Sequence, residues 1–258
     1  MIKCNTLREI AFSNETQSSR KVMVVRRFDT ALSKEIRDMF STKQNVKTTL
    51  IHGPQELSKT FLYEAAIYWA EEGHRVFYIT PEPLQSLPSA CHDRTSSSYM
   101  VLKLIRFIYL SDYKSLVTQL TELHTFVSLP SIFLLDDLDH YLNDDATEIQ
   151  EPCQEEKKMR IARACSVIFD AINSCSRISN TAVHACVWSS SALKKSDMDP
   201  TIYFRNIWNV SEDREKKIIS LEKVGHETCE PDGYPSFEYH KFQDGTRILK
   251  KVFRTFLD

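Results

Sequence analysis

The chain has 258 residues, which is enough for one α/β domain with an extension or for two very small domains. A hydrophobic content of 42% and a charged content of 26% are those of a soluble globular protein. No apolar run approaches the roughly 20 residues of a membrane span, and the N-terminus lacks the apolar core of a secretory signal. The formal net charge of −2 gives no overall attraction to nucleic acid, so any contact with DNA must come from local patches.

The seven cysteines are scattered and none forms a C-x-x-C or C-x-C pair. This usage favours reduced thiols in a cytosolic or nuclear protein. The histidines are dispersed as well, and the sequence predicts no metal site of its own. The cysteines are Cys4, Cys91, Cys153, Cys165, Cys175, Cys186 and Cys229.

Residues 1–47 are polar and mixed in charge, and we expect them to form an N-terminal extension to a main domain at residues 48–258. Weak periodicity within the extension predicts one short amphipathic helix. The apolar residues of that helix are Phe28, Leu32, Ile36 and Phe40.

The most informative segment is Gly53–Thr60, with the sequence GPQELSKT. It follows the short apolar run 49–51 and precedes a helix-patterned stretch at 61–72. This is the P-loop pattern G-x-x-x-x-G-K-[ST] in a strand–loop–helix setting, with Ser58 in place of the second glycine. Backbone amides at the start of the helix would attract phosphate, Lys59 would reach the β- and γ-phosphates, and the Thr60 hydroxyl would bind Mg²⁺.

Every residue of the segment is a candidate nucleotide-binding position. These residues are Gly53, Pro54, Gln55, Glu56, Leu57, Ser58, Lys59 and Thr60. The second glycine of the pattern usually permits a backbone conformation that a Cβ atom disfavours, so Ser58 would cost about 1 kcal/mol or more. The alternative is an ordinary strand–turn–helix in which Ser-Lys-Thr occurs by chance.

Downstream, apolar strands alternate with helices up to about residue 200. A strand is predicted at 75–80 and ends before Pro81 and Pro83, and a second is predicted at 104–109. A helix follows a Ser111 N-cap, and an acidic surface loop is expected at 143–156. The other predicted elements are the most apolar strand at 132–137, a long helix at 159–178 and a strand at 182–188.

Beyond residue 200 the pattern is β-rich, with a hairpin turn at Asp244-Gly245. Strands are predicted at 207–210, 218–224, 237–242 and 246–253. Alternating strands and helices followed by a β-rich end predict an α/β domain with a mostly parallel sheet and antiparallel strands at one edge.

Three strand ends carry candidate site residues. Asp136 ends the most apolar strand and fits a Walker B carboxylate, which would hold Mg²⁺ through water; the alternative is a buried strand ending in solvated acids. Glu82 follows the strand 75–80 and could polarise an attacking water, or it could be a surface residue between two prolines. Ser189 and Ser190 could sense a γ-phosphate, although such serines are more often turn formers.

These segments together resemble RecA-like recombinase paralogues, and in particular the small RecA-like subunits that partner a SWIM-type zinc-finger protein in the metazoan Shu complex. The resemblance covers roughly residues 48–254. Its most distinctive piece is Pro-Leu-Gln-Ser-Leu-Pro at 83–88, which generic P-loop proteins have no reason to carry. The other matching segments are Val-Phe-Tyr-Ile at 76–79, Leu-Lys-Leu-Ile-Arg-Phe at 102–107, Phe-Leu-Leu-Asp-Asp-Leu-Asp-His-Tyr-Leu at 133–142 and the terminal hairpin at 242–245.

The resemblance implies a RecA-like P-loop NTPase core that binds single-stranded DNA and supports strand-exchange filaments in homologous recombination, and hence a location in the nucleus. It implies ATP and Mg²⁺ as cofactors, with Lys59, Thr60 and Asp136 on the family's Walker positions. Glu82 falls where active recombinases place the catalytic glutamate, and Lys59 would act with it. Ser58 departs from the glycine, so nucleotide binding is a safer expectation than hydrolysis. The chain has no C-x-C…C-x-H pattern, so the zinc would belong to the SWIM-type partner.

Phe28-Asp29-Thr30-Ala31 matches the F-x-x-A segment by which recombinases of this type link protomers. Phe28 and Ala31 would then fill two small apolar pockets on a RecA-type recombinase or one of its paralogues. The alternative is a chance amphipathic turn, because only two positions of the segment are fixed.

DNA contact needs a basic track with stacking surfaces. Lys194 and Lys195, in the loop after the strand 182–188, lie where recombinases carry a DNA-binding loop. A second candidate is the terminal hairpin, unless its charges are simply a solvated face. Its basic residues are Lys241, Arg247, Lys250, Lys251 and Arg254, interleaved with Tyr239, Phe242 and Phe253.

Two other classes compete with a weak or DNA-stimulated ATPase. In a non-catalytic scaffold the P-loop would serve folding, would stabilise the zinc-finger partner and would dock on the recombinase. A small-molecule kinase would want an Arg-rich lid over the phosphates, and no such segment follows the core.

Overall fold

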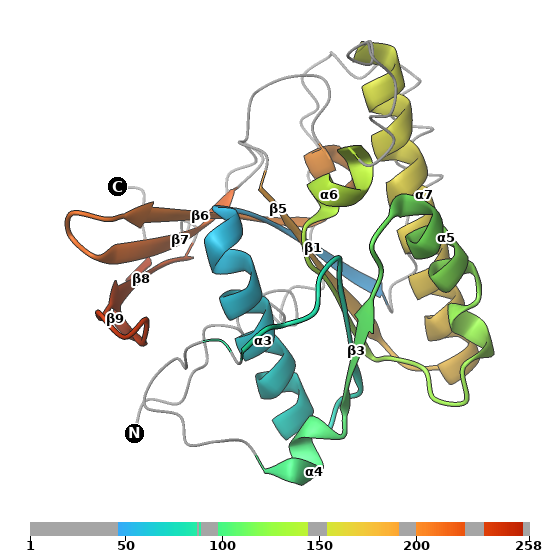
Figure 1. The fold of residues 1–258 in the computed structure, drawn as a ribbon, viewed down its shortest axis with the longest axis horizontal. Helices are drawn as coiled ribbons and strands as arrows, with labels where there is room; N and C mark the ends of the chain where they lie inside the picture. Colours follow the sequence, from blue (N-terminus) through green and yellow to red (C-terminus); the bar gives the residue numbers. More distant parts are fainter. Residues whose placement is uncertain are drawn as a thin grey trace, which may run out of the picture.

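The computed structural model describes residues 46–86, 88, 98–143, 154–190, 200–224 and 235–254. These residues form a nine-stranded sheet with helices on both faces (Figure 1). The strands are β1 (Val46–His52), β2 (Val76–Thr80), β3 (Ile105–Tyr109), β4 (Ile132–Leu135), β5 (Val183–Ser189), β6 (Asn206–Asp213), β7 (Ile218–Val224), β8 (Pro235–Lys241) and β9 (Arg247–Arg254). The helices are α3 (Gln55–Glu71), α4 (Tyr99–Leu102), α5 (Tyr113–Thr121), α6 (Leu138–Asn143) and α7 (Gln154–Ser179), with 3-10 turns η1 (Leu123–Thr125) and η2 (Pro200–Tyr203).

The strand order is β3-β2-β4-β5-β1-β6-β7-β8-β9. All neighbours from β3 to β6 pair in parallel, and β6, β7, β8 and β9 pair antiparallel. The predicted α/β architecture, with a mostly parallel sheet and an antiparallel edge, is therefore confirmed. The most apolar strand, β4, lies between β2 and β5, and every one of its residues is buried.

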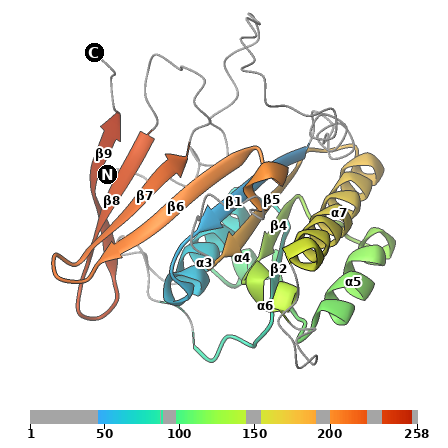
Figure 2. The same cartoon turned by 90° about the horizontal axis from the view of Figure 1, so that it is seen from above.

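Alternation along the parallel strands supplies two apolar layers, one on each face of the sheet. In β2, Val76 and Tyr78 join the layer under α3, whereas Phe77 and Ile79 join the layer under α5 and α7. The end-on view shows α3 on one side of the parallel strands and α5, α6 and α7 on the other (Figure 2). Among the described residues, no helix has the length and apolar character needed to cross a bilayer.

The antiparallel strands continue the sheet past β1 and lie beside α3 (Figures 1 and 2). Their inner face shares the apolar layer of α3 through Trp208, Leu221 and Tyr239. The ring of Phe61 on α3 meets Tyr239 edge-on, with 5.9 Å between the ring centroids. Helix α3 is therefore packed from two directions, by the parallel strands and by the antiparallel extension.

Several local details differ from the predictions. The N-cap of α5 is Asp112 rather than Ser111, because the Asp112 carboxylate accepts the Ser115 amide across 2.7 Å. This helix ends at Thr121, and a separate 3-10 turn carries Leu123. The short helices α4, which has no buried residue, and α6 were not predicted, and α7 begins at Gln154 rather than at residue 159. Most of the expected acidic loop, residues 144–153, lies outside the described residues.

Candidate nucleotide site

Four polar or flexible positions meet at the carboxyl edge of the parallel strands, where α/β folds place their ligand sites. Thr80 ends β2, Asp136 follows β4, Ser189 ends β5 and Gly53 follows β1. The Gly53 amide donates to the Ser189 carbonyl across 3.1 Å, and the Asp136 amide donates to the Ile79 carbonyl across 2.8 Å. These bonds fix the ends of β1 and β4 at the same edge of the sheet, with β5 between the two strands.

The Walker A segment is helical where a loop was predicted. Helix α3 begins at Gln55 rather than at Phe61, with Pro54 as its N-cap residue. Proline suits this position because its fixed φ fits the entry to a helix and its missing N–H would have no partner there. The Leu57 amide donates to the Pro54 carbonyl across 3.0 Å, which closes the first turn. Only Gly53 and Pro54 remain between β1 and the helix.

The first turn is fixed to the body of the domain by Leu57 and Ser58. Leu57 is 3% exposed and belongs to the apolar layer under α3. Ser58 is fully buried, and its hydroxyl donates a hydrogen bond to Oδ1 of Asp136. The residue that replaces the second glycine of the P-loop pattern is therefore bound directly to the Walker B carboxylate.

Asp136 has a second hydroxyl partner, because Thr80 Oγ1 donates to its Oδ2 across 3.1 Å. The Asp136 side chain has no exposed surface. Burial raises the pKa of this carboxyl above its ordinary value, although the hydrogen bonds from Ser58 and Thr80 and the charge of Lys59 act in the opposite direction. Both carboxylate oxygens are therefore engaged within the protein.

Thr60 is not among the partners of Asp136. Residues two apart on an α-helix are rotated by about 200° around its axis. With Ser58 directed at Asp136, Thr60 leaves the helix on the other side. Among the described residues, Ser58 rather than Thr60 is hydrogen-bonded to the carboxylate, and the magnesium pair of Thr60 and Asp136 stays a prediction.

Lys59 and Glu82 do face one another. The Lys59 Nζ lies 3.7 Å from Oε2 of Glu82, and the two side chains are 37% and 74% exposed. The Thr80 hydroxyl also donates to the Glu82 carbonyl across 3.1 Å, which fixes the backbone where Glu82 leaves β2. The predicted catalytic pair thus lies together at the carboxyl edge, on the solvent side of Asp136.

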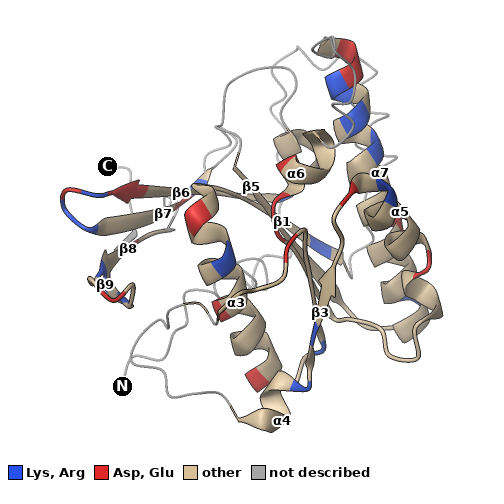
Figure 3. Cartoon of the chain, in the orientation of Figure 1, with Lys and Arg blue, Asp and Glu red and all other residues tan. Residues whose placement is uncertain are grey.

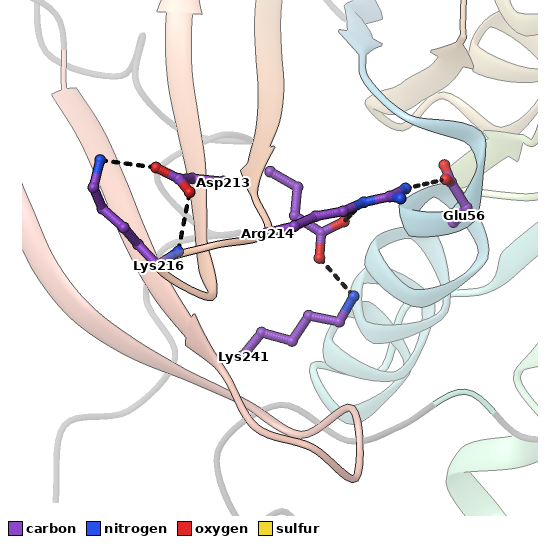
Figure 4. A network of polar contacts seen from close by, with 6 residues as sticks. Glu56, Asp213, Arg214, Lys216 and Lys241 are labelled. Carbon is purple, nitrogen blue, oxygen red and sulfur yellow. Dashed lines mark hydrogen bonds and ion pairs between the residues drawn. The ribbon is translucent and has the colours of Figure 1, made fainter.

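Glu56 points outward from the first turn to a charge network on the antiparallel extension (Figure 4). Arg214 binds Oε1 of Glu56 across 2.9 Å, and its Nε lies 4.0 Å from Oε2 of Glu212. Lys241 binds the other oxygen of Glu212 across 2.7 Å. Glu56 also lies in the first turn of α3, where a negative charge favours the helix dipole. The network was not predicted, since nothing in the sequence pairs residues so far apart along the chain.

These contacts differ in strength. A hydrogen bond to a buried charged group contributes about 1.5–3 kcal/mol, and full burial of a leucine contributes about 1.5–3 kcal/mol. Solvent-exposed ion pairs such as Glu56–Arg214 and Lys59–Glu82 contribute 0 to about 1 kcal/mol. The helical form of the Walker A segment therefore depends mainly on Ser58 and Leu57.

This arrangement does not fit a triphosphate. A phosphate cradle needs consecutive amides curved around the anion, whereas the amides from Leu57 onward are directed into helical hydrogen bonds. Both oxygens of the Asp136 carboxylate accept hydrogen bonds from hydroxyls. Leu57, which precedes Ser58, is buried. Binding ATP and Mg²⁺ would require residues 55–58 to leave their present positions.

The serines at the end of β5 have separate environments. Ser189 is fully buried, and its hydroxyl has no hydrogen-bond partner among the described residues. The Ser190 amide donates to Oδ2 of Asp139 across 2.6 Å, which ties the end of β5 to α6. The described residues contain no group of three or more His, Cys, Asp or Glu that could hold a metal ion.

The predicted DNA contacts are only partly described. Arg247 is 2% exposed, and its guanidinium carbon lies 4.9 Å from the centroid of the Phe61 ring, so it packs inside rather than facing solvent. Lys250, on the edge strand β9, is exposed. The candidates Lys194, Lys195, Phe28 and Ala31 lie outside the described residues.

Solved structures show which fold this is. The RadB recombinase is similar to the chain with a TM-score of 0.53 and 12% identity, over 80% of this chain and 91% of that one. A second solved structure, of an ATPase domain, is similar with a TM-score of 0.50 and 10% identity, over 84% of this chain and 89% of that one. The chain therefore has the RecA-like fold. No family model matches the sequence, and no curated protein matches it.

Proposed function

We propose that the chain is a recombinase-paralogue subunit that binds single-stranded DNA, works beside a SWIM-type zinc-finger protein and supports homologous-recombination repair in the nucleus. The observation that carries the proposal is the contact of Ser58 with Asp136, which joins the Walker A helix to the Walker B strand within a RecA-like sheet. The resemblance of the segment 83–88, Pro-Leu-Gln-Ser-Leu-Pro, to the paralogues named above supports the choice of this subunit class.

The geometry supports the part of the proposal in which the subunit works without ATP turnover. Both oxygens of Asp136 are engaged by hydroxyls, and the amides of the Walker A segment are helical. A scaffold needs the RecA-like sheet and its surfaces but does not need an open phosphate cradle. Stabilisation of the zinc-finger partner and docking on a recombinase both suit this role.

Among the described residues, Figure 3 shows lysines and arginines on several separate elements, with a run of them along the first half of α7. DNA affinity should therefore come from a few local cations. We expect Lys194→Ala/Lys195→Ala, and separately Lys250→Ala, to weaken binding of a fluorescent oligo-dT in anisotropy titrations. Each lost phosphate contact should reduce the salt slope by about 0.7.

The matched control is Lys114→Ala, which removes an exposed lysine from α5, at the opposite end of the molecule from β9 (Figure 2). Its affinity and salt slope should equal those of the wild type. If wild-type protein shows no salt-dependent affinity for oligo-dT, alone or with its zinc-finger partner, the proposed function is wrong. If the wild type binds oligo-dT and the lysine substitutions leave its affinity and salt slope unchanged, the DNA contact lies elsewhere on the chain.

Partner binding is tested separately from DNA binding. Co-expression with a SWIM-type zinc-finger protein should raise the soluble yield of both chains and allow co-purification. Phe28→Glu places a charge where an apolar pocket is expected, so recovery of a RecA-type recombinase or paralogue in a pull-down should fall. Unchanged recovery would remove the F-x-x-A assignment without affecting the other parts of the proposal.

A DNA-stimulated ATPase is the second candidate, favoured by the position of Lys59 and Glu82 beside Asp136. On this alternative, Lys59→Ala abolishes hydrolysis stimulated by single-stranded DNA, because Lys59 would bind the phosphates. If the chain is a scaffold, the same variant changes neither DNA affinity nor the stability of the complex. Phosphate release with and without oligo-dT separates the two.

A further inference from the structure

The hydroxyl of Ser58 occupies the carboxylate that the Walker pattern assigns to magnesium. Ser58 Oγ donates to Asp136 Oδ1 from the fourth residue of α3, and both residues are fully buried. The contact therefore has two effects at once. It fills the Asp136 carboxylate, and it holds the first turn of α3 in the helical form.

We propose that Ser58 is a latch that keeps the Walker A segment closed to nucleotide until the Ser58–Asp136 hydrogen bond is broken. The inference rests on the proposed function in one respect, because it takes residues 53–60 as the nucleotide segment of a RecA-like subunit. Ser58 is a positioning residue here: it acts on the helix and on Asp136 and need not touch a nucleotide.

Two contacts besides the Ser58–Asp136 bond oppose an outward movement of the first turn. Leu57 lies in the apolar layer under α3, so an outward movement of the segment exposes it to water. Glu56 is bound to Arg214 on the antiparallel extension, so the same movement also breaks this ion pair (Figure 4). Opening of the first turn therefore disrupts the Leu57 packing, the Glu56–Arg214 ion pair and the buried Ser58–Asp136 hydrogen bond.

The latch proposal differs from the usual explanation of why a P-loop that lacks its second glycine binds nucleotide poorly. On that explanation the Cβ atom of Ser58 blocks a glycine-only backbone conformation, so only glycine restores nucleotide binding. On the latch proposal the hydroxyl is responsible, so removing Oγ alone releases Asp136. Ser58→Ala and Ser58→Gly therefore separate the two, because alanine keeps the Cβ atom and lacks the hydroxyl.

The experiment measures binding of a fluorescent N-methylanthraniloyl-ATP with Mg²⁺ to the full chain. We expect Ser58→Ala to bind at least about tenfold more tightly than the wild type, which corresponds to loss of one hydrogen bond to a buried charge. Hydrogen exchange of amides 56–60 should be faster in Ser58→Ala, whereas amides in the middle of α3 should keep their wild-type rates.

Ser176→Ala is the matched control. Ser176 is also a nearly buried helical serine, and its hydroxyl donates to the Thr181 carbonyl across 2.8 Å, far from the site in α7. It should lose stability without gaining affinity for the nucleotide. If Ser58→Ala does not fold, Ser58→Cys keeps the size of the side chain with a weaker donor and serves the same comparison.

A gain in Ser58→Gly with none in Ser58→Ala or Ser58→Cys overturns the latch and supports the backbone explanation. Equal nucleotide affinity in all the Ser58 variants and the wild type also overturns it. Oligo-dT affinity measured on the same proteins tests the proposed function independently. If the chain binds oligo-dT but the Ser58 variants do not gain nucleotide affinity, the proposed function stands and the latch proposal is wrong. If the Ser58 variants gain nucleotide affinity but the chain does not bind oligo-dT, the latch proposal stands and the proposed function is wrong.

Discussion

The hydroxyl of Thr80 and the carboxylate of Asp136 are joined by a 3.1 Å hydrogen bond that links the ends of β2 and β4. Neither residue has exposed surface. Removal from water destabilises the charged carboxylate more than its two hydroxyl partners and Lys59 stabilise it, so the pKa of Asp136 is raised. Ionisation of Asp136 therefore lowers the stability of the native state.

Asp136→Asn should consequently stabilise the protein at neutral pH. A raised native pKa means that the folded chain binds more protons than the unfolded chain between about pH 3.8 and the native pKa. Wild-type stability must fall as the pH rises through that window, and the amide lacks this loss. We expect the free energy of unfolding at pH 7 to be higher than that of the wild type in urea denaturation, and the gain to vanish near about pH 3.5.

Asp112→Asn is the contrasting control. Asp112 is the N-cap of α5, where hydrogen bonds from Ser115 lower the carboxyl pKa, and asparagine also caps helices well. Its substitution should bring no gain at pH 7. If Asp136→Asn instead loses stability by the same amount at every pH, the two hydroxyls contribute more than the buried charge costs.

The contact that matters most at this site could not be predicted from the sequence. The strands were predictable because apolar runs such as 132–135 have the length and burial of central strands, and β4 is where that pattern placed it. Which side chain of the helix faces Asp136 depends on the residue at which the helix begins. Because α3 starts directly after Pro54 rather than at Phe61, Ser58 and not Thr60 lies beside the carboxylate.

The burial of individual basic residues on the terminal hairpin could not be predicted from the sequence pattern either. Arg247 and Lys250 look equivalent in the charged hairpin, yet β9 places the first against the ring of Phe61 and the second in solvent. The two residues are three apart on the strand, so strand alternation points their side chains to opposite faces of the sheet. The predicted basic track is therefore divided between the core and the surface.

Arg247→Ala and Lys250→Ala should have opposite phenotypes. Loss of the packed guanidinium should lower the free energy of unfolding by about 1–2 kcal/mol and leave oligo-dT affinity unchanged, because Arg247 supports α3 rather than a ligand. Lys250→Ala should leave stability within about 0.5 kcal/mol of wild type. Chemical denaturation and anisotropy on both variants measure this. A loss of DNA affinity in a stably folded Arg247→Ala protein would show that the arginine reaches the surface.

His184 should make the fold sensitive to acid. The ring accepts or donates a 2.9 Å hydrogen bond with Thr49 in the interior, and burial, followed by the charge of Lys47, lowers its pKa to about 4. The unfolded chain takes up a proton near pH 6.5 while the native chain does not, so stability present above pH 6.5 is lost as the pH falls to 4. The loss approaches about 3 kcal/mol.

His184→Gln keeps an amide that can bind Thr49 and removes this titration. Its stability should be lower than that of the wild type at pH 7 and should change less between about pH 6.5 and 4. His124→Gln, at an exposed position in η1, should follow the wild-type profile. Thermal unfolding measured across this pH range tests the prediction. A wild-type stability that does not change with pH would contradict the lowered pKa of His184.

Gly53→Ala tests whether the first glycine of the Walker pattern is needed for packing. The Cβ atom of an alanine there would lie 2.8 Å from Val210 Cβ and 2.9 Å from a ring carbon of Trp188, closer than real Cβ contacts. Both neighbours are buried in the layer under α3, so neither can move aside easily. We expect a loss of about 1–3 kcal/mol in denaturation experiments.

Gly73→Ala separates steric crowding from backbone strain, because Gly73 has a φ of 87° at the end of α3 and nothing within 4 Å of its added Cβ. That variant should lose about 1 kcal/mol through strain alone. If Gly53→Ala costs no more than this, Trp188 and Val210 yield to the new methyl group. A larger loss, the same with and without Mg²⁺-ATP, would show that this glycine is required by the packing of β1, β5 and β6 independently of any phosphate.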